Sequence, residues 1–528
     1  MPSSVGAIPY RLRVGVTGHR ALPDDPAFIA RVRFALQRVR HMAPSSPATP
    51  LCMALVSPLA EGADRLMARM ALDDQDAVLV VPLPLPVDDY MADFAAEDSK
   101  REFQGLLARA QEVVRLPRAE TREEAYQNVA DHLVERCDIL IALWDGQPAR
   151  GPGGTAEVVA MARARLLPLL WIDTRAPFAL HEERGDGIAR DSFHHLDLFN
   201  RGRFDAVRLN DDITRRMTAL GAASARAGLD PAVTRPFAAW NLPYLARADL
   251  LALRHQAVFL RVSAAVFVLA AVSASIAAAQ QLFFPRWPGV GWLEVILPLA
   301  AVFILLTNRR WRLHERWSAY RLLAEWLRAR LFLAMVGVTE DGERGHPDSP
   351  SEGWLVRAFE EVWARRPRVE PTPDHVGPLR EALLAAWIQD QIDYQHATNR
   401  RFAQRQRRAT YAVVALFVAT LLVAALHLLA ESGFASIHVP PTGWTFLSTA
   451  LPAAAGAVSG LAARREYERH AQRYGRMARD LEKVKRHLER AHDLAHLRVA
   501  ARRAEALMLA ENDDWSSITR FHDIDLTL

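Results

Sequence analysis

Three short segments in the first third of the chain, 17–20, 57–65 and 144–157, combine glycines with side chains that bind anions. Glycines let backbone N–H groups approach an oxyanion, and the positive end of a helix dipole favours a negative charge. Arginine and protonated histidine neutralise a phosphate, and a threonine hydroxyl can donate to it. The residue types therefore predict a phosphate or nucleotide site. The candidate ligand-binding residues are Thr17, Gly18, His19, Arg20, Ser57, Glu61, Gly62, Asp64, Asp145, Gly151, Gly153, Gly154, Thr155 and Glu157.

Each of these segments also has a plainer interpretation. The Gly-Pro-Gly-Gly-Thr run at 151–155 is typical of a turn followed by the start of a helix, and segment 17–20 could be a loop with an exposed arginine. We favour a site because all three segments are expected to follow strands of one sheet. The sequence has no Walker A lysine motif, so ATP hydrolysis by a P-loop mechanism is not supported.

The elements that must position these loops are six apolar runs separated by helical patterns. Apolar β runs that alternate with helices are typical of an α/β, doubly wound, mostly parallel Rossmann-like sheet. Ligands bind such sheets at the carboxyl ends of the strands, near the switch in strand order. The predicted strands are 12–17, 51–57, 77–82, 112–116, 138–144 and 168–173, and the predicted helices include 64–72, 88–109, 122–137 and 155–165.

The second half of the chain is predicted to be an all-α membrane domain. Four apolar runs lie at 258–279, 293–307, 411–429 and 444–463. Each is close to the roughly 20 residues that a helix needs to cross a bilayer. They form two hairpins, and each hairpin leads into a long basic helix.

The two hairpins repeat at an offset of 154 residues, which indicates a duplication. Matches fall on equivalent positions of the second span and of the helix that follows it. The matched pairs are Pro298 and Pro452, Ala300 and Ala454, Ala301 and Ala455, Arg310 and Arg464, Tyr320 and Tyr474, Ala324 and Ala478, and Leu327 and Leu481.

The distribution of charge predicts the orientation of the spans. Basic residues crowd 400–408, 309–312 and 464–465, whereas the hairpin tips at 282–290 and 431–443 carry almost none. By the positive-inside rule, both termini and the soluble domain are expected on the cytoplasmic side of the membrane. Residues before Tyr10 lack the apolar stretch of a cleavable signal peptide, so the first span is expected to direct insertion.

Composition also limits the function classes. The net charge is only +4, but the basic residues concentrate beside the spans, which favours anionic membrane lipid over nucleic acid as a partner. The two cysteines, Cys52 and Cys137, lie in strand-like runs and are expected to be reduced core thiols. Neither these cysteines nor the pair His194 and His195 has the spacing of a metal site, so no metal is expected.

The N-terminal domain resembles the SLOG superfamily, which includes the cytokinin-activating LOG enzymes and DNA-processing proteins. The resemblance covers about the first third of the chain and rests on segments 14–20, 57–65 and 138–146, with Gly153 to Glu157. It implies that the domain binds a nucleotide or a nucleotide-derived ligand, including an NAD-derived one, with no further cofactor. Arg20 and the helix that begins at Thr155 would hold its phosphate, and Glu61 or Asp64 would contact a ribose hydroxyl.

The sequence departs from the enzymatic LOG branch at the position of the catalytic glutamate. That branch uses a Pro-Gly-Gly-x-Gly-Thr-x-x-Glu loop, whereas here Thr155 is followed by Ala156 and then Glu157. A shift of one residue at a helix start turns a side chain by about 100°. We therefore favour a sensor over an enzyme. A membrane-anchored LOG-type nucleotide phosphoribohydrolase, with Glu157 as its catalytic residue, is the alternative.

Each hairpin with its following helix resembles a SLATT domain, a two-span module found beside SLOG domains in bacterial conflict loci. The resemblance rests on the basic exit from the second span and on the segment 320–328, Tyr-Arg-Leu-Leu-Ala-Glu-Trp-Leu-Arg. It implies an oligomeric, pore-forming effector of antiphage defence, controlled by the nucleotide-sensing domain. The expected domains are 1–175 (SLOG-like), 176–240 (linker), 241–337 (first SLATT-like module), 338–378 (linker) and 379–528 (second SLATT-like module with C-terminal helices).

Overall fold

The computed structural model describes residues 5–73, 77–94, 96–148, 153–183, 188, 190–338, 350–431, 441–465 and 467–520. The chain divides into two compact units. The sheet unit comprises Met1–Arg203 and Glu343–Arg366, and the helical unit comprises Phe204–Gly342 and Pro367–Leu528. The predicted α/β domain followed by an all-α region with four candidate membrane helices is confirmed.

The sheet unit contains a seven-stranded sheet in the order β4-β3-β2-β1-β5-β6-β7. Every neighbouring pair is parallel except β6 and β7. All six predicted strands are present, and the seventh was not predicted because its sequence, Leu-His-Glu-Glu, has a single apolar residue. The strands are β1 (Tyr10–Gly18), β2 (Leu51–Val56), β3 (Ala77–Leu83), β4 (Glu112–Arg115), β5 (Ile139–Trp144), β6 (Leu169–Asp173) and β7 (Leu180–Glu183).

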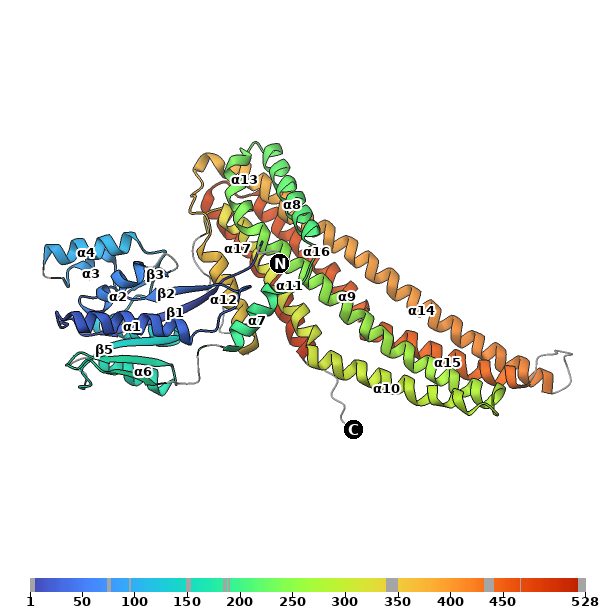
Figure 1. Ribbon diagram of the computed structural model, residues 1–528. Helices are drawn as coiled ribbons and strands as arrows, with labels where there is room; N and C mark the ends of the chain where they lie inside the picture. The colour runs from blue at the N-terminus through green and yellow to red at the C-terminus, as the bar shows by residue number, and fades with distance from the viewer. Residues whose placement is uncertain are drawn as a thin grey trace. The chain divides into compact units, whose positions relative to one another are not determined.

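Helices cover both faces of this sheet (Figure 1). Right-handed crossovers put helices on opposite faces when the chain moves outward from β1 in opposite directions. Accordingly, α1 packs with α2, and α5 packs with α6. The helix predicted at 88–109 is two helices, α3 and α4, separated by a turn. The helices of the unit are α1 (Pro26–Met42), α2 (Ala63–Leu72), α3 (Val87–Met91), α4 (Glu97–Ala108), α5 (Arg122–Arg136), α6 (Thr155–Ala164), α7 (Arg190–Asn200) and α12 (Pro350–Ala364).

The central strands of the sheet are buried on both faces. All six residues of β5 are buried, as expected for a strand between two helical layers. Val134 of α5, Leu140 of β5 and Val158 of α6 belong to one apolar cluster. Fully burying such a side chain stabilises the fold by about 1.5–3 kcal/mol, so this core holds the strand ends that carry the candidate site.

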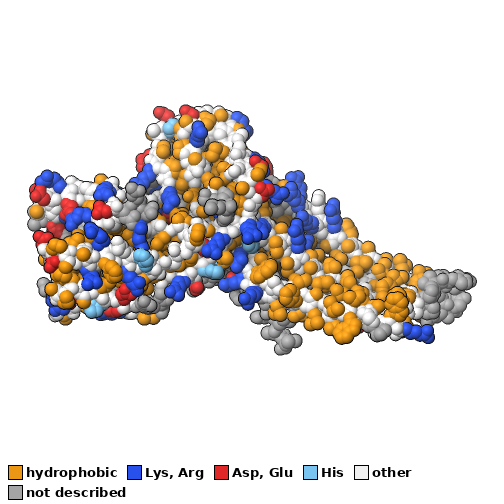
Figure 2. Space-filling model, in the orientation of Figure 1, with side chains coloured by type: hydrophobic (Ala, Val, Ile, Leu, Met, Phe, Trp, Pro, Cys, Tyr) orange, Lys and Arg blue, Asp and Glu red, His pale blue; other side chains and the backbone are white. Residues whose placement is uncertain are grey.

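The helical unit contains four long helical stretches that are apolar enough to cross a membrane. In each stretch, at most 6 % of the most apolar 18 residues are buried against other parts of the chain. Figure 2 shows hydrophobic side chains gathered over the long helices, and water-exposed apolar surface of this extent is unusual in soluble proteins. The helices are α8 (Ala206–Arg226), α9 (Pro231–Phe283), α10 (Pro288–Trp311), α11 (Leu313–Met335), α13 (Val376–Leu383), α14 (Asp390–Glu431), α15 (Pro441–Arg464), α16 (Tyr467–Glu489) and α17 (Leu494–Arg520).

The predicted repeat is visible in the bounds of these helices. Helices α11 and α16 are both 23 residues long and begin 154 residues apart, at Leu313 and Tyr467. Helices α10 and α15 are both 24 residues long and begin at Pro288 and Pro441. Each contains its proline, Pro298 or Pro452, in the interior of the span.

Candidate functional site

Backbone contacts join the loop that follows β1 to the start of α2. The Ala63 N–H donates to the His19 carbonyl at 3.1 Å. A Cβ at Gly62, whose φ is +85°, would lie 2.2 Å from the Arg20 carbonyl oxygen. A Cβ at Gly18 would lie 2.4 Å from the Cβ of Ala63. No side chain fits at either distance, so glycine at both positions lets the first two predicted segments meet.

The first segment also meets the end of β5, at the point where the strand order switches. The Nε2 atom of His19 lies 3.0 Å from Oδ1 of Asp145. Burial opposes the charge of Asp145, but the hydrogen bonds from the Gln147 N–H and from His19 outweigh it and lower the pKa of this carboxyl. Asp145 is therefore ionised at neutral pH and orients the imidazole of His19.

The side chains of Ser57 and Asp64 stabilise the second segment by accepting hydrogen bonds from its backbone N–H groups. Both are buried. The Leu59 N–H donates to the Ser57 hydroxyl at 3.1 Å, and the Ala60 N–H donates to Oδ2 of Asp64 at 3.2 Å. Burial raises the pKa of Asp64 to about 7, and hydrogen bonds from the Ala60 N–H and the Ser57 hydroxyl, together with nearby arginines, offset this rise only in part. Asp64 thus supports the loop.

Glu61 faces the start of α4, where it accepts a hydrogen bond from the Ser99 hydroxyl. Arg65 donates to the same hydroxyl at 2.7 Å and to the Leu59 carbonyl at 3.1 Å. Its guanidinium also lies 4.5 Å from the centroid of the Phe94 ring. Glu61 is therefore part of a polar network that fixes the second segment to the turn between α3 and α4.

The third segment begins α6. Gly153, with φ +69°, donates its N–H to Oε2 of Glu157 at 2.7 Å. Gly154 is the N-cap residue of α6, and Thr155 is its first residue. Glu157 thus places a carboxylate at the helix start, where an anionic ligand would otherwise interact. Gly151, which we also predicted to bind ligand, lies outside the described residues.

Tyr126 of α5 connects the third segment with the turn between α3 and α4. A Cβ at Gly153 would lie 3.2 Å from the Cβ of Tyr126, so that the loop packs directly on this residue. The Tyr126 hydroxyl donates to Asp93. Burial and this carboxylate raise the pKa of Tyr126 to about 12. The sequence did not indicate Tyr126 or Asp93 as site residues, because neither lies in a glycine loop.

Arg20 is a cation of the site that has no partner among the described residues. Its side chain is exposed and makes no hydrogen bond or ion pair with another described residue. Its charge acts on three groups of the site, Asp64, Tyr90 and Tyr126, whose pKa values it lowers in opposition to burial. The geometry therefore leaves a guanidinium available for an anion beside two glycine loops.

Helix α12 lies between the two hairpins in the sequence but belongs to the sheet unit. It packs against the start of β1, at the opposite end of the strand from the glycine loops. Arg11 pairs with Glu361, and Arg13 pairs with Glu360. The Arg11 and Glu361 side chains are only 7 % and 1 % exposed. Removing one partner of a buried ion pair typically costs about 3–5 kcal/mol, so α12 is firmly held.

Helix α7 packs against the aromatic side chains of α12 and stabilises the same end of the sheet unit, near the start of β1. Trp354 of α12 lies 6.1 Å from Phe199 of α7, measured between ring centroids. Asn200 of α7 donates to the Ile8 carbonyl at 2.7 Å. The eight residue steps of β1 from Tyr10 to Gly18 span about 26 Å at ~3.3 Å each. The strand therefore connects α12 with the glycine loops.

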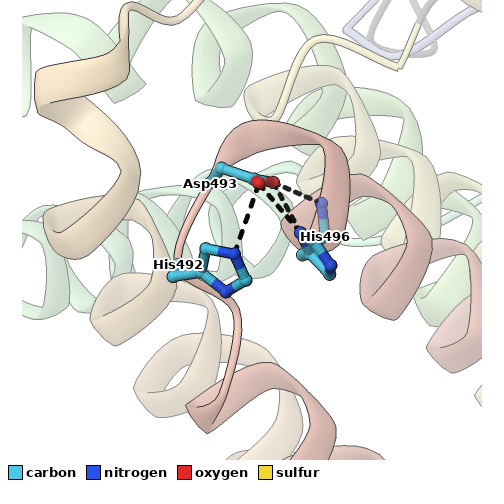
Figure 3. A group of neighbouring side chains, drawn as sticks. All are labelled: His492, Asp493 and His496. Carbon is cyan, nitrogen blue, oxygen red and sulfur yellow. Dashed lines mark hydrogen bonds and ion pairs between the residues drawn. The ribbon is translucent and has the colours of Figure 1, made fainter.

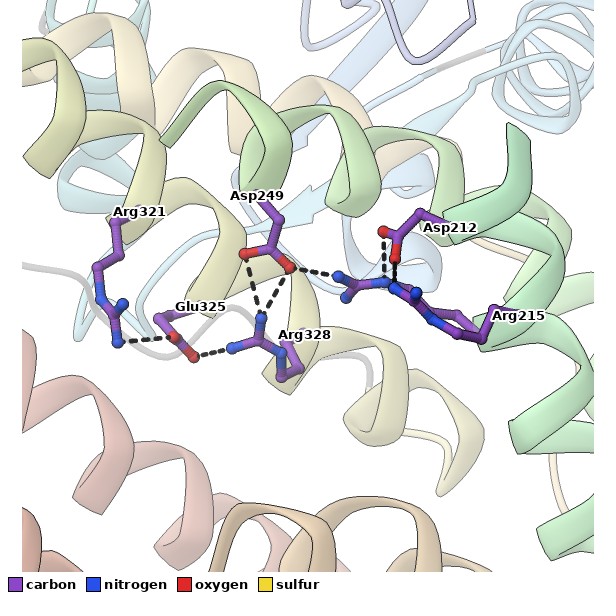
Figure 4. A network of polar contacts seen from close by, with 7 residues as sticks. Asp212, Arg215, Asp249, Arg321, Glu325 and Arg328 are labelled. Atoms are coloured by element: carbon purple, nitrogen blue, oxygen red, sulfur yellow. Dashed lines mark hydrogen bonds and ion pairs between the residues drawn. The ribbon is translucent and has the colours of Figure 1, made fainter. Parts of the chain in front are cut away.

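The helical unit contains an ion-pair network that joins α8, α9 and α11 (Figure 4). Asp249 lies between two guanidinium groups, 2.8 Å from Arg216 and 2.9 Å from Arg328. Arg328 also pairs with Glu325, and Arg216 with Asp212. Asp249 belongs to the same helix as the first apolar run, so the network anchors that helix to its neighbours.

A second polar cluster lies between α16 and α17 and was not predicted (Figure 3). His492, Asp493 and His496 bring their ligand atoms within 4.8 Å of one another. Two imidazoles and a carboxylate suit zinc and related metals. However, Asp493 accepts from the His496 N–H at 2.8 Å, as a helix cap does, and all three side chains are largely exposed. Helix capping accounts for the arrangement. The His-Asp-x-x-His spacing is the signal that could have revealed it.

Residues 384–515 match the family described as SMODS and SLOG-associating 2TM effector domain 1. The match spans the second hairpin and its following helices, and it confirms the predicted resemblance there. No curated protein matches the chain. Because the matched segment covers about a quarter of the chain, it identifies this module only. Together with the four apolar helices, it points to a membrane-associated effector in defence.

Proposed function

We propose that the chain is an inner-membrane effector of antiphage defence whose sheet unit senses a nucleotide-derived second messenger. Arg20 and the start of α6 would bind the phosphate of the ligand. The sheet unit and both termini would lie in the cytoplasm, and the messenger would drive a homo-oligomer to permeabilise the membrane. The second hairpin's match to an effector family supports this proposal.

The observation that carries the proposal is the position of α12 in the chain. Helix α11 of the first hairpin module ends at Met335, and the helices of the second module begin at Val376. Between them, α12 packs on β1 and α7 of the sheet unit. A displacement of β1 would therefore act on both hairpins through the segments that flank α12.

Such coupling requires that the ligand binds one state of the chain better than another. Each tenfold preference shifts the equilibrium by about 1.4 kcal/mol. Arg20, whose guanidinium has no partner among the described residues, gives the bound ligand an interaction that the free chain lacks. We expect phosphate binding to draw Arg20 and the start of α6 together and so to shift the loop that continues from β1.

The test is recovery of the ligand by the full chain in detergent. Extracts of phage-infected and uninfected bacteria are incubated with the protein, and bound small molecules are identified by mass spectrometry. We expect an intact nucleotide on the wild type and on Arg101→Ala, which removes an exposed arginine of α4. Arg20→Ala should recover none. Equal recovery by Arg20→Ala, or no nucleotide on any variant, would contradict the proposal.

Glu157→Gln distinguishes the sensor from the hydrolase alternative. A glutamine can still accept from the Gly153 N–H, but it removes a negative charge from the start of α6. A sensor should therefore bind an anionic ligand as tightly as before, or more tightly. A phosphoribohydrolase would release free base from a nucleoside monophosphate, and Glu157→Gln would abolish that release.

A further inference from the structure

A cavity of about 160 Å³ lies between α14, α15 and α16 of the helical unit. Its walls combine two kinds of side chain. Arg405 and Arg408 of α14 form a cationic wall, and Val458 and Leu461 of α15 form an apolar wall. Tyr467, at the start of α16, also lines the cavity. A cavity of this composition suits a ligand with a negative group at one end and an apolar part at the other.

The two arginines are free to bind an anion. Both are exposed, and neither donates a hydrogen bond nor forms an ion pair with another residue of the described part of the chain. Their spacing of three residues puts them on one face of α14. A third guanidinium lies close by, because Nη1 of Arg465 donates to the Tyr467 hydroxyl at 2.8 Å. The positive charge at the cavity has no counter-charge among its lining residues.

The cavity lies where two apolar segments end. On α14, the apolar run 411–429 begins three residues after Arg408. On α15, the lining residues Val458 and Leu461 belong to the apolar run that ends before Arg464. In a membrane this level corresponds to the boundary between lipid tails and headgroups. The cationic wall would thus face headgroup phosphates, and the apolar wall would face acyl chains.

The first hairpin does not repeat this arrangement. At the offset of 154 residues, Leu251 replaces Arg405 and Leu313 replaces Tyr467, and only Arg254 keeps a charge. A general attraction of basic residues to the cytoplasmic leaflet would apply to both hairpins. The cavity therefore indicates a feature particular to the second module.

We propose that this cavity is a binding site for an anionic phospholipid. The phosphate of the headgroup binds Arg405 and Arg408, and an acyl chain lies against Val458 and Leu461. This assignment is independent of the nucleotide site in the sheet unit. Occupancy of the cavity holds α14, α15 and α16 together at the membrane boundary, so the lipid sets the packing of the second hairpin.

The test uses the full chain in detergent, titrated with dioleoylphosphatidylglycerol and followed by native mass spectrometry. The variant is Arg405→Gln/Arg408→Gln. The matched control is Arg400→Gln/Arg407→Gln, which removes the same charge from exposed positions about 80–160° away from Arg405 and Arg408 around α14. At roughly 1 kcal/mol for each arginine near a phosphate, the variant should bind the lipid about 30-fold more weakly. The control should change binding by less than about threefold.

Three further arms complete the test. Val458→Phe fills the cavity but keeps both arginines, so it should also weaken binding, and it replaces the arginine variant if that variant fails to fold. Dioleoylphosphatidylcholine should bind far more weakly than the anionic lipid. If both double variants lost lipid binding equally, the lipid would be attracted by the general positive charge of α14 and not by a site, and the proposal would be overturned. Displacement of the lipid by millimolar inorganic phosphate would identify a free-anion site and overturn the lipid assignment.

Discussion

The buried carboxyl of Asp64 makes the stability of the sheet unit depend on pH. Its pKa is raised from 3.8 to about 7 because burial disfavours the charged form. Below pH 3.8 the carboxyl is protonated in both the folded and the unfolded chain. Between these values the folded state keeps a proton that the unfolded state has released. The contribution to stability is therefore fully present below pH 3.8 and is lost as the pH rises through about 7.

The size of this effect follows from the shift in pKa. A difference of about 3 units corresponds to about 4 kcal/mol over the whole range, and about 2–3 kcal/mol of it falls between pH 5 and pH 8. Asp64→Asn keeps an oxygen that accepts from the Ala60 N–H but cannot ionise. The variant should lose this pH dependence, and at pH 8 it should be more stable than the wild type.

Hydrogen exchange of the full chain in detergent measures this directly. Peptides from β1 and α2 of the wild type and the variant are compared at the same pH, so that the intrinsic exchange rates cancel. Asp98→Asn, at an exposed position of α4, is the control and should behave as the wild type. An equal pH dependence in the wild type and Asp64→Asn would refute the assignment of the raised pKa to Asp64.

Three further substitutions test the glycine loop at Gly62, the attachment of α12 to the sheet and the ion-pair network around Asp249. Gly62→Ala places a methyl group 2.2 Å from the Arg20 carbonyl at a positive φ; nucleotide recovery should fall at least tenfold, with faster exchange in segment 17–20. Glu361→Gln leaves the buried Arg11 without its main counter-charge; α12 should loosen by about 3 kcal/mol, measured as trypsin cleavage after its last turn. Asp249→Asn removes the carboxylate between two arginines; thermal unfolding in detergent should show a loss of about 3 kcal/mol.

Each of these substitutions has a matched control. Gly105→Ala introduces a methyl group that meets nothing within 4 Å, on an exposed face of α4, and should leave binding unchanged. Glu97→Gln breaks an exposed pair with Lys100, and Asp480→Asn breaks one with Lys483. Exposed pairs contribute about 0–1 kcal/mol. Losses as large in these controls as in the buried variants would contradict the energetic assignments.

The sequence predicted the sheet because its central strands are short, continuous apolar runs. Residues of β5, for example, are buried on both faces, so burial alone specifies the strand. Strand β7 was missed because it lies at the edge of the sheet, where Glu182 and Glu183 are tolerated. The helix predicted at 88–109 breaks where Phe94 turns inward beneath Arg65, a tertiary contact that helical periodicity does not encode.

The glycine loops of the site were predictable, whereas their supports were not. Gly62 and Gly153 show the positive φ that sequence reasoning assigns to such loops. Tyr126 contributes from a helix with an ordinary apolar pattern, so its contact with the third segment depends on the fold. The pairing of Arg11 with Glu361 joins residues 350 positions apart. No local pattern predicts that the segment between the two hairpins belongs to the sheet unit.

The central claim is that a ligand on the sheet unit controls the membrane helices. The most direct test is dye release from liposomes that contain the full chain, after addition of the small-molecule extract from infected cells. Wild-type protein should release dye only with that extract, and Arg20→Ala should release none, although it inserts equally well. Release that is the same without the extract, or the same for Arg20→Ala, would contradict the claim.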